Sequence, residues 1–153
     1  MVPLKAYVNP SQVHVDVVAA NKDELLRAIA ARMASPELGL DAATIADLLS
    51  ARERLASTGV GLGIAIPHAS TPVLLEPLVA LFRPREAVPF DAVDGDPVRL
   101  VAVVLAPASQ QALHLRLLAR IARMLCTERV RDALLAAETA DEAYSCLDLT
   151  DMP

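Results

Sequence analysis

At 153 residues the chain has the length of one domain, which can bury roughly two thirds of the surface that its unfolded form exposes. Its net charge is −5, and its basic residues form no patch interleaved with aromatic side chains, which argues against nucleic acid as a partner. We expect a cytoplasmic protein without membrane insertion, since the N-terminus lacks a secretory signal pattern and no apolar run approaches the roughly 20 residues of a membrane span.

The first half of the chain predicts one strand followed by two helices. Residues 13–18 alternate apolar and polar, which indicates a strand with His14 on the solvent side. A capping asparagine precedes a helical pattern that ends near residue 34, and a capping aspartate precedes a second that ends near residue 54.

The second half predicts buried strands and then three helices. Residues 77–82 and 98–105 are nearly continuous apolar runs of strand length, which is typical of strands covered on both faces. Between these two runs lies a turn with Asp-Gly and Asp-Pro pairs. The three helices are expected to be capped by Ser109, Thr127 and Thr139.

The order of these elements favours an α/β fold. Connections that are too varied for strict strand–helix alternation predict a three-layer α/β/α domain with a mixed parallel and antiparallel sheet and helices on both faces. We expect residues 1–153 to form this single domain. Cys126 and Cys146 have no disulfide or metal-ligand spacing, so we expect two buried free thiols, and the three scattered histidines predict no metal site.

The stretch TGVGLGIAIPHAS, residues 58–70, carries three alternating glycines. A dinucleotide fingerprint would need a helix after the glycines, but I-A-I-P is a poor helix start, and a P-loop would need G-K-[ST]. We therefore exclude a nucleotide cofactor. A close approach of another chain segment to one side of an extended strand would explain Gly59, Gly61 and Gly63.

Three side chains are candidates for chemistry, each with an ordinary alternative. His68 is either a hydrogen-bonded loop histidine or a nucleophile for phosphorus, presented by the fixed backbone of Pro67. His114 lies opposite an arginine stripe of its helix and points inward, either as a core histidine or beside a reactive group in the first helical turn. Arg52 is either a solvated helix-end cation or a phosphate-binding arginine.

The stretch RERLASTGVGLGIAIPHAS, residues 52–70, resembles the signature of the type 2 IIA domains of the bacterial phosphoenolpyruvate-dependent phosphotransferase system. This family includes mannitol, fructose and nitrogen-regulatory members. Further similarity covers residues 88–107 and residues 114–137, so that nearly the whole chain is matched in order. The implied fold is a mixed sheet with helices on both sides.

The resemblance also assigns roles to residues. It implies that His68 is phosphorylated, that His114 helps to position the phosphoryl group or its acceptor, and that Arg52 is the active-site arginine. The phosphoryl-site loop would consist of Gly59, Gly61, Gly63 and Pro67.

The family implies a phosphoryl carrier that needs no cofactor and accepts phosphate from an HPr-like protein. A chain without a fused IIB or membrane domain is more similar to the nitrogen-regulatory branch, which binds regulatory target proteins. One alternative is a sugar-specific component that passes phosphate to a IIB domain. Another is a regulatory binding module that carries no phosphate, because Leu62 and Ala69 stand where the family usually has Asn and Gly.

Overall fold

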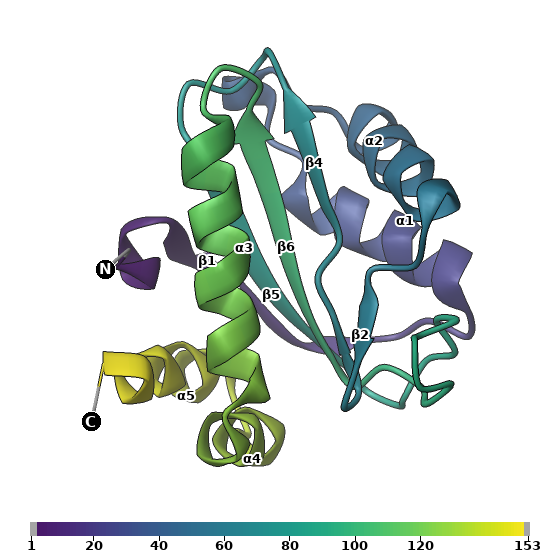
Figure 1. The fold of residues 1–153 in the computed structure, drawn as a ribbon, viewed down its shortest axis with the longest axis vertical. Helices are drawn as coiled ribbons and strands as arrows, with labels where there is room; N and C mark the ends of the chain where they lie inside the picture. The colour runs from purple at the N-terminus through teal and green to yellow at the C-terminus, as the bar shows by residue number, and fades with distance from the viewer. Residues whose placement is uncertain (1–2, 152–153) are drawn as a thin grey trace.

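A computed structural model describes residues 3–151, which form one mixed sheet with helices packed around it (Figure 1). Residues 1–2 and 152–153 of the expected domain lie outside the described part. The strands are β1 (Val8–Val17), β2 (Gly59–Gly61), β3 (Ile64–Ala65), β4 (His68–Thr71), β5 (Leu78–Pro84) and β6 (Leu100–Pro107).

The sheet order is β1-β5-β6-β3-β2, with β4 also paired to β6. β1 runs parallel to β5, and both β3 and β4 run parallel to β6. β5 is antiparallel to β6, and β2 is antiparallel to β3. The predicted mixed sheet is confirmed.

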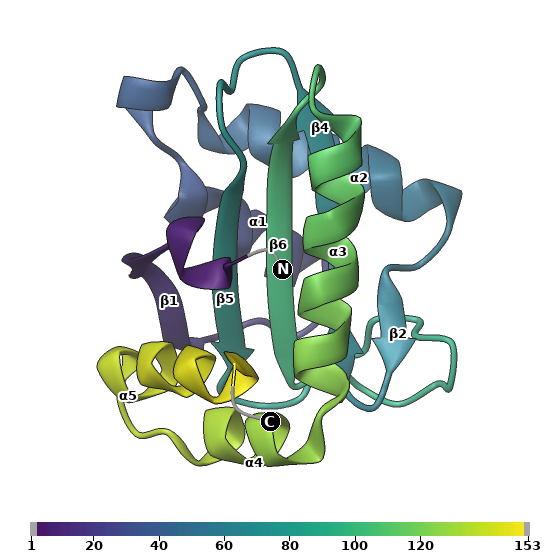
Figure 2. The same cartoon turned by 60° about the vertical axis from the view of Figure 1, so that its left-hand side comes forward.

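Helices cover both faces of this sheet. In Figures 1 and 2, α1 and α2 lie on one side and α3 on the other, while α4 and α5 lie near one end of α3. The three-layer α/β/α prediction is therefore confirmed. The helices are α1 (Lys22–Met33), α2 (Ala42–Leu55), α3 (Gln111–Cys126), α4 (Glu128–Ala136) and α5 (Ala140–Ser145), with short 3₁₀ segments η1 (Leu4–Ala6), η2 (Pro36–Leu38) and η3 (Cys146–Asp151).

Strand β6 separates two hydrophobic cores, and all of its residues are buried. One set of alternate β6 residues packs in the core under α3, α4 and α5, and the other set packs in the core under α1 and α2. This two-sided burial explains the unbroken apolar run in the sequence. The first set is Leu100, Ala102, Val104 and Ala106; the second is Val101, Val103 and Leu105.

Most of the expected helix caps are present. The side chains of Asn21, Asp41 and Thr139 each accept a hydrogen bond from the backbone N–H three residues later. Thr127 stands at the N-cap of α4, but its hydroxyl donates to the Arg123 carbonyl instead of capping. The Ser109 prediction is wrong, because α3 begins one residue later and residue 110 occupies its N-cap without a side-chain hydrogen bond.

The environments of His14 and of both cysteines differ from the prediction. His14 is half-buried, with its ring stacked on Phe82, because α1 covers the sheet face that we expected to be open. Cys126 is exposed and Cys146 is half-buried, so the burial prediction is wrong, although both thiols are free. Within residues 3–151, no helix combines the length and apolar character needed to span a membrane.

Candidate functional site

The glycine-rich stretch forms a hairpin, so the single extended strand expected from the alternating glycines is wrong. β2 and β3 pair in antiparallel fashion, and the turn between them passes through Gly61, Leu62 and Gly63 at φ values of 95°, 59° and 75°. Glycine adopts these left-handed conformations without steric cost, whereas leucine does so only with strain. The hairpin therefore requires its two turn glycines for backbone reasons.

The same glycines face a second segment of the chain, which confirms the expected close approach. A Cβ atom on Gly59 would lie 2.8 Å from the Ala92 side chain, and one on Gly61 would lie 3.2 Å from the carboxylate of Asp94. A Cβ atom on Gly63 would lie 3.6 Å from the Arg99 side chain, which is an ordinary van der Waals contact. The glycines thus pack the hairpin onto the 92–99 segment.

His68 is the first residue of β4 and follows directly on the hairpin. Ile66 and Pro67 connect β3 to β4, and the Pro67 carbonyl accepts a hydrogen bond from Val104 of β6. The Nδ1 atom of His68 lies 2.8 Å from the Ile66 carbonyl oxygen. Because a carbonyl only accepts hydrogen bonds, Nδ1 carries the proton and Nε2 keeps its lone pair.

The surroundings of His68 favour its neutral form. Burial lowers the pKa of the imidazole, and the positive charge of Arg52 lowers it further. The hydrogen bond to Ile66 and the negative charge of Glu53 act in the opposite direction, and the net shift is downward. A neutral ring with an unprotonated Nε2 is a nucleophile at neutral pH.

His114 points inward from the first turn of α3, as expected, and is only 9% exposed. Its ring centroid lies 5.5 Å from that of His68, with the planes at 78°. The Ser70 hydroxyl lies 3.5 Å from Nδ1, whereas the buried Nε2 has no hydrogen-bond partner among the described residues. Burial and the neighbouring His68 both lower the pKa of His114.

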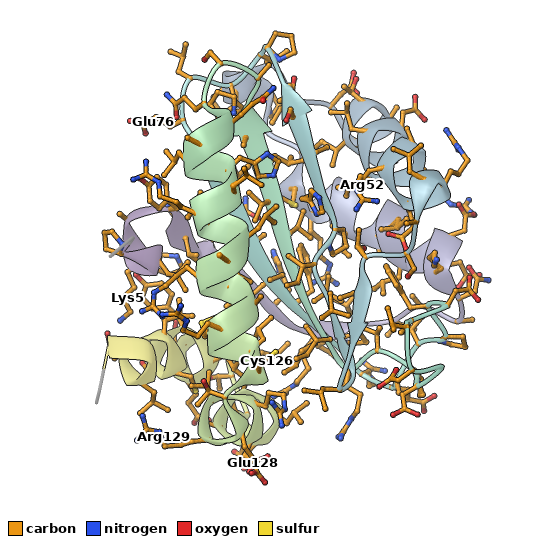
Figure 3. All side chains as sticks on the ribbon, viewed as in Figure 1. Lys5, Arg52, Glu76, Cys126, Glu128 and Arg129 are labelled. Carbon is orange, nitrogen blue, oxygen red and sulfur yellow. The ribbon has the colours of Figure 1, made fainter. Side chains whose placement is uncertain are left out.

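Arg52 lies in the last turn of α2 and completes the cluster. Its Nη1 donates to the Ala56 carbonyl at 2.9 Å, which holds the guanidinium on the side of α2 that faces β4 (Figure 3). Arg52 and His68 line the same cavity of about 340 Å³. Arg52 and His68 thus share a cavity, and His114 joins the site through its ring contact with His68 but does not line that cavity. The remaining lining residues are Ser57, Thr58, Val60, Ile66, Leu118, Ala119 and Ala122.

Glu53 also belongs to this region, although no motif in the sequence identified it. It is 8% exposed and accepts hydrogen bonds from both the backbone N–H and the hydroxyl of Thr58. Glu53 extends the buried stripe of Ile45 and Leu49 at intervals of four residues. An acid on the apolar face of a helix is the signal that could have identified it.

The two departures from the family pattern have different structural consequences. Ala69 lies in β4 opposite Leu105, where an extended strand readily holds its Cβ atom. Leu62 takes a left-handed conformation that leucine rarely adopts, and its backbone N–H donates to the Asp94 carboxylate at 3.0 Å. Neither residue lines the cavity beside His68.

Residues 6–149 match the family model described as phosphoenolpyruvate-dependent sugar phosphotransferase system, EIIA 2. The chain belongs to this family. It is 41% identical over 144 residues to the nitrogen regulatory protein of Pseudomonas aeruginosa, covering 94% of both chains. It is 43% identical over 101 residues to the fructose-specific EIIA component of Haloferax volcanii, covering 66% of both.

The fold of this EIIA protein also matches a solved structure. The crystal structure of the nitrogen regulatory protein IIA-Ntr from Neisseria meningitidis superposes with a TM-score of 0.88 at 31% sequence identity. The match covers 94% of the present chain and 98% of the Neisseria chain.

No group of three or more metal-ligating side chains occurs among the described residues.

Proposed function

We propose that this EIIA protein is a phosphoryl carrier that accepts its phosphoryl group on Nε2 of His68. The observation that carries the proposal is the 2.8 Å contact between His68 Nδ1 and the Ile66 carbonyl, which leaves Nε2 as the free nitrogen. The lowered pKa of His68 keeps that nitrogen unprotonated at neutral pH. This geometry favours a nucleophilic His68 over a loop histidine with hydrogen bonds at both ring nitrogens.

The transfer step is a displacement at phosphorus. The lone pair of His68 Nε2 attacks the phosphorus of a phosphohistidine on an HPr-like donor protein, and a new nitrogen–phosphorus bond forms. The nitrogen–phosphorus bond of the donor breaks, and its electron pair returns to the donor imidazole. Such transfer depends mainly on positioning and on charge stabilisation at the phosphoryl oxygens.

His114 and Arg52 are the groups that would supply this stabilisation. The Nε2 of His114 is a buried polar atom without a partner among residues 3–151, and a phosphoryl oxygen would satisfy it as a hydrogen-bond acceptor. Arg52 adds a fixed positive charge to the cavity that His68 lines. The Pro67 carbonyl accepts a hydrogen bond from Val104 of β6, which fixes the backbone that leads into His68. We assign Gly59, Gly61 and Gly63 to the packing of the hairpin.

We assign the carrier to nitrogen regulation in the cytoplasm, where its phosphorylation state would be sensed by regulatory target proteins. The support is the similarity to the Pseudomonas and Neisseria nitrogen regulatory proteins, each along more than nine tenths of its length. A sugar-specific role with a IIB acceptor is the second candidate, because the fructose-specific Haloferax protein is similar along 66% of the chain.

Phosphotransfer from purified donors tests both assignments. The protein is incubated with a purified HPr-like protein of either the nitrogen or the sugar branch that carries a radiolabelled phosphoryl group. We expect faster labelling from the nitrogen-branch donor and none in His68→Ala. Labelling retained in His68→Ala would refute the site, and a preference for the sugar-branch donor would favour the second candidate. A wild-type protein labelled by neither donor would indicate a binding module without phosphate.

A further inference from the structure

Glu53 carries a buried carboxylate at the end of α2, directly beside the active-site arginine. Its oxygens accept from the Thr58 backbone N–H at 2.9 and 3.1 Å and from the Thr58 hydroxyl at 2.6 Å. Lys22 Nζ of α1 lies 3.0 Å from Oε1. A buried carboxylate is costly unless it is paired and hydrogen-bonded, and here both conditions are met.

The contacts of Glu53 continue through two residues to the imidazole of His68. The Thr58 carbonyl accepts a hydrogen bond from the Ile66 N–H at 3.0 Å. The Ile66 carbonyl in turn lies 2.8 Å from His68 Nδ1. Hydrogen bonds therefore link Glu53 to Thr58, Thr58 to Ile66 and Ile66 to His68. A displacement of Thr58 would move the Ile66 carbonyl that orients the imidazole.

From this chain of contacts we propose that Glu53 is a positioning residue for His68. By anchoring Thr58, and through it Ile66, the carboxylate keeps the proton of His68 on Nδ1 and leaves Nε2 open toward the cavity. Lys22 balances the charge of Glu53 and also lies 3.3 Å from the exposed carboxylate of Asp91. The proposed purpose rests on phosphoryl transfer by His68, but the coupling between Glu53 and the imidazole can be measured without it.

The ion pair between Glu53 and Lys22 is not by itself a sign of a stabilising role. Buried ion pairs are weak evidence for stability, because well-packed apolar residues of similar volume often stabilise a fold equally well. The charges that act on His68 are Arg52 and Glu53, which oppose each other, and His114 adds a titratable neighbour. Loss of Glu53 therefore changes both the geometry and the electrostatic balance of the nucleophile.

The first experiment measures the protonation and tautomer of His68 by nitrogen NMR across a pH titration of the full chain. In Glu53→Gln we expect a lower pKa of His68 and partial movement of the ring proton from Nδ1 to Nε2. In Lys22→Met we expect a higher pKa of His68, because the charge of Glu53 is no longer balanced. Opposite shifts in the two variants would not arise from a generally loosened fold.

Asp47→Asn is the matched control, since Asp47 is an exposed acid on the same helix and its loss changes the net charge equally. We expect no change of the His68 pKa or tautomer in this variant. Where Glu53→Gln fails to fold, Thr58→Val tests the same link by removing the 2.6 Å hydroxyl contact. An unchanged His68 signal in folded Glu53→Gln, or in both Thr58→Val and Lys22→Met, would overturn the proposal.

The second experiment measures the single-turnover rate of transfer from the phosphorylated HPr-like donor. Loss of an outer partner that orients a metal-binding histidine costs about 10- to 100-fold in affinity or activity, and by analogy we expect a decrease of about tenfold in Glu53→Gln. An unlabelled wild-type protein would refute the carrier function, while the NMR titration would still report on Glu53. A normal rate in Glu53→Gln with an altered tautomer would overturn the role in transfer.

Discussion

Two histidines of this EIIA protein lie on strands of one sheet, yet only one of them has an open nitrogen. Burial is the largest cause of the lowered pKa at both His14 and His68, and an arginine lowers each further. The His14 ring stacks on Phe82 with centroids 5.0 Å apart, and its Nε2 is buried. The cavity beside His14 is about 20 Å³, against about 340 Å³ beside His68.

The difference shows that burial and a nearby arginine are not sufficient for a reactive histidine. At His68 a backbone carbonyl holds Nδ1, so the other nitrogen is directed away from that bond. At His14, Nδ1 lies 3.4 Å from Arg32 Nη1. The cavity of about 20 Å³ beside this ring is too small for a phosphoryl group. Access to the free nitrogen therefore distinguishes the two sites.

The largest expected effect comes from removing each histidine in turn. His68→Ala should abolish incorporation of phosphate, whereas His14→Gln should retain it, because only His68 has an accessible nucleophilic nitrogen. Intact-protein mass spectrometry after incubation with the phosphorylated donor measures the incorporation, and circular dichroism checks that both variants fold. If folded His14→Gln took up no phosphate while His68→Ala still did, His14 and not His68 would be the phosphorylated residue.

A smaller effect is expected from His114, which has no equivalent beside His14. Removal of one hydrogen-bond donor to a developing charge commonly costs about 100- to 1,000-fold in rate, so His114→Ala should transfer phosphate about a hundredfold more slowly. Rapid-quench kinetics measure the rate, with Arg123→Ala on the exposed side of α3 as the control. A wild-type rate in His114→Ala would assign His114 to the core alone.

All three histidines contribute to the pH dependence of the free energy of unfolding. Since folding lowers the pKa of His14, His68 and His114 below 6.5, the unfolded chain binds protons first as the pH falls. The free energy of unfolding should therefore decrease between about pH 7 and pH 5.5, before most carboxylates titrate. Urea unfolding at several pH values measures it. His14→Phe should show a weaker decrease, and a rise in stability toward acid would contradict the assigned shifts.

The smallest expected effect concerns the hairpin that precedes His68. Leu62 is 59% exposed at a φ of 59°, so Leu62→Asn should relieve backbone strain with little loss of buried surface. We expect a gain of about 1 kcal/mol or less in the free energy of unfolding. The control is Leu75→Asn, at an exposed leucine without a positive φ, and equal gains in both variants would indicate a general effect of surface polarity.

Much of the fold could be predicted because each layer leaves a pattern in the sequence. The buried strand β6 and the helix caps at Asn21 and Asp41 could be predicted from the residue types along the sequence. The burial of His14 was not, because alternation in a strand separates two faces without telling whether helices cover both. The structure places α1 over that second face.

The candidate site was predictable in part for a similar reason. His68, His114 and Arg52 belong to motifs whose spacing is visible in the sequence, and the fold brings them together. The hairpin was missed, because alternating glycines suit either an extended strand or a turn with positive φ values. The role of Glu53 depends on contacts between α1, α2 and the hairpin, which no single helix pattern contains.

The adjacent positions of Arg52 and Glu53 also restrict how the length of α2 can vary in evolution. A helix turns by about 100° per residue, so one inserted or deleted residue before this pair would rotate both charges away from their partners. The cation would leave the cavity, and the acid would leave Lys22 and Thr58. We expect homologues to keep the interval between Asp41 and Thr58 constant.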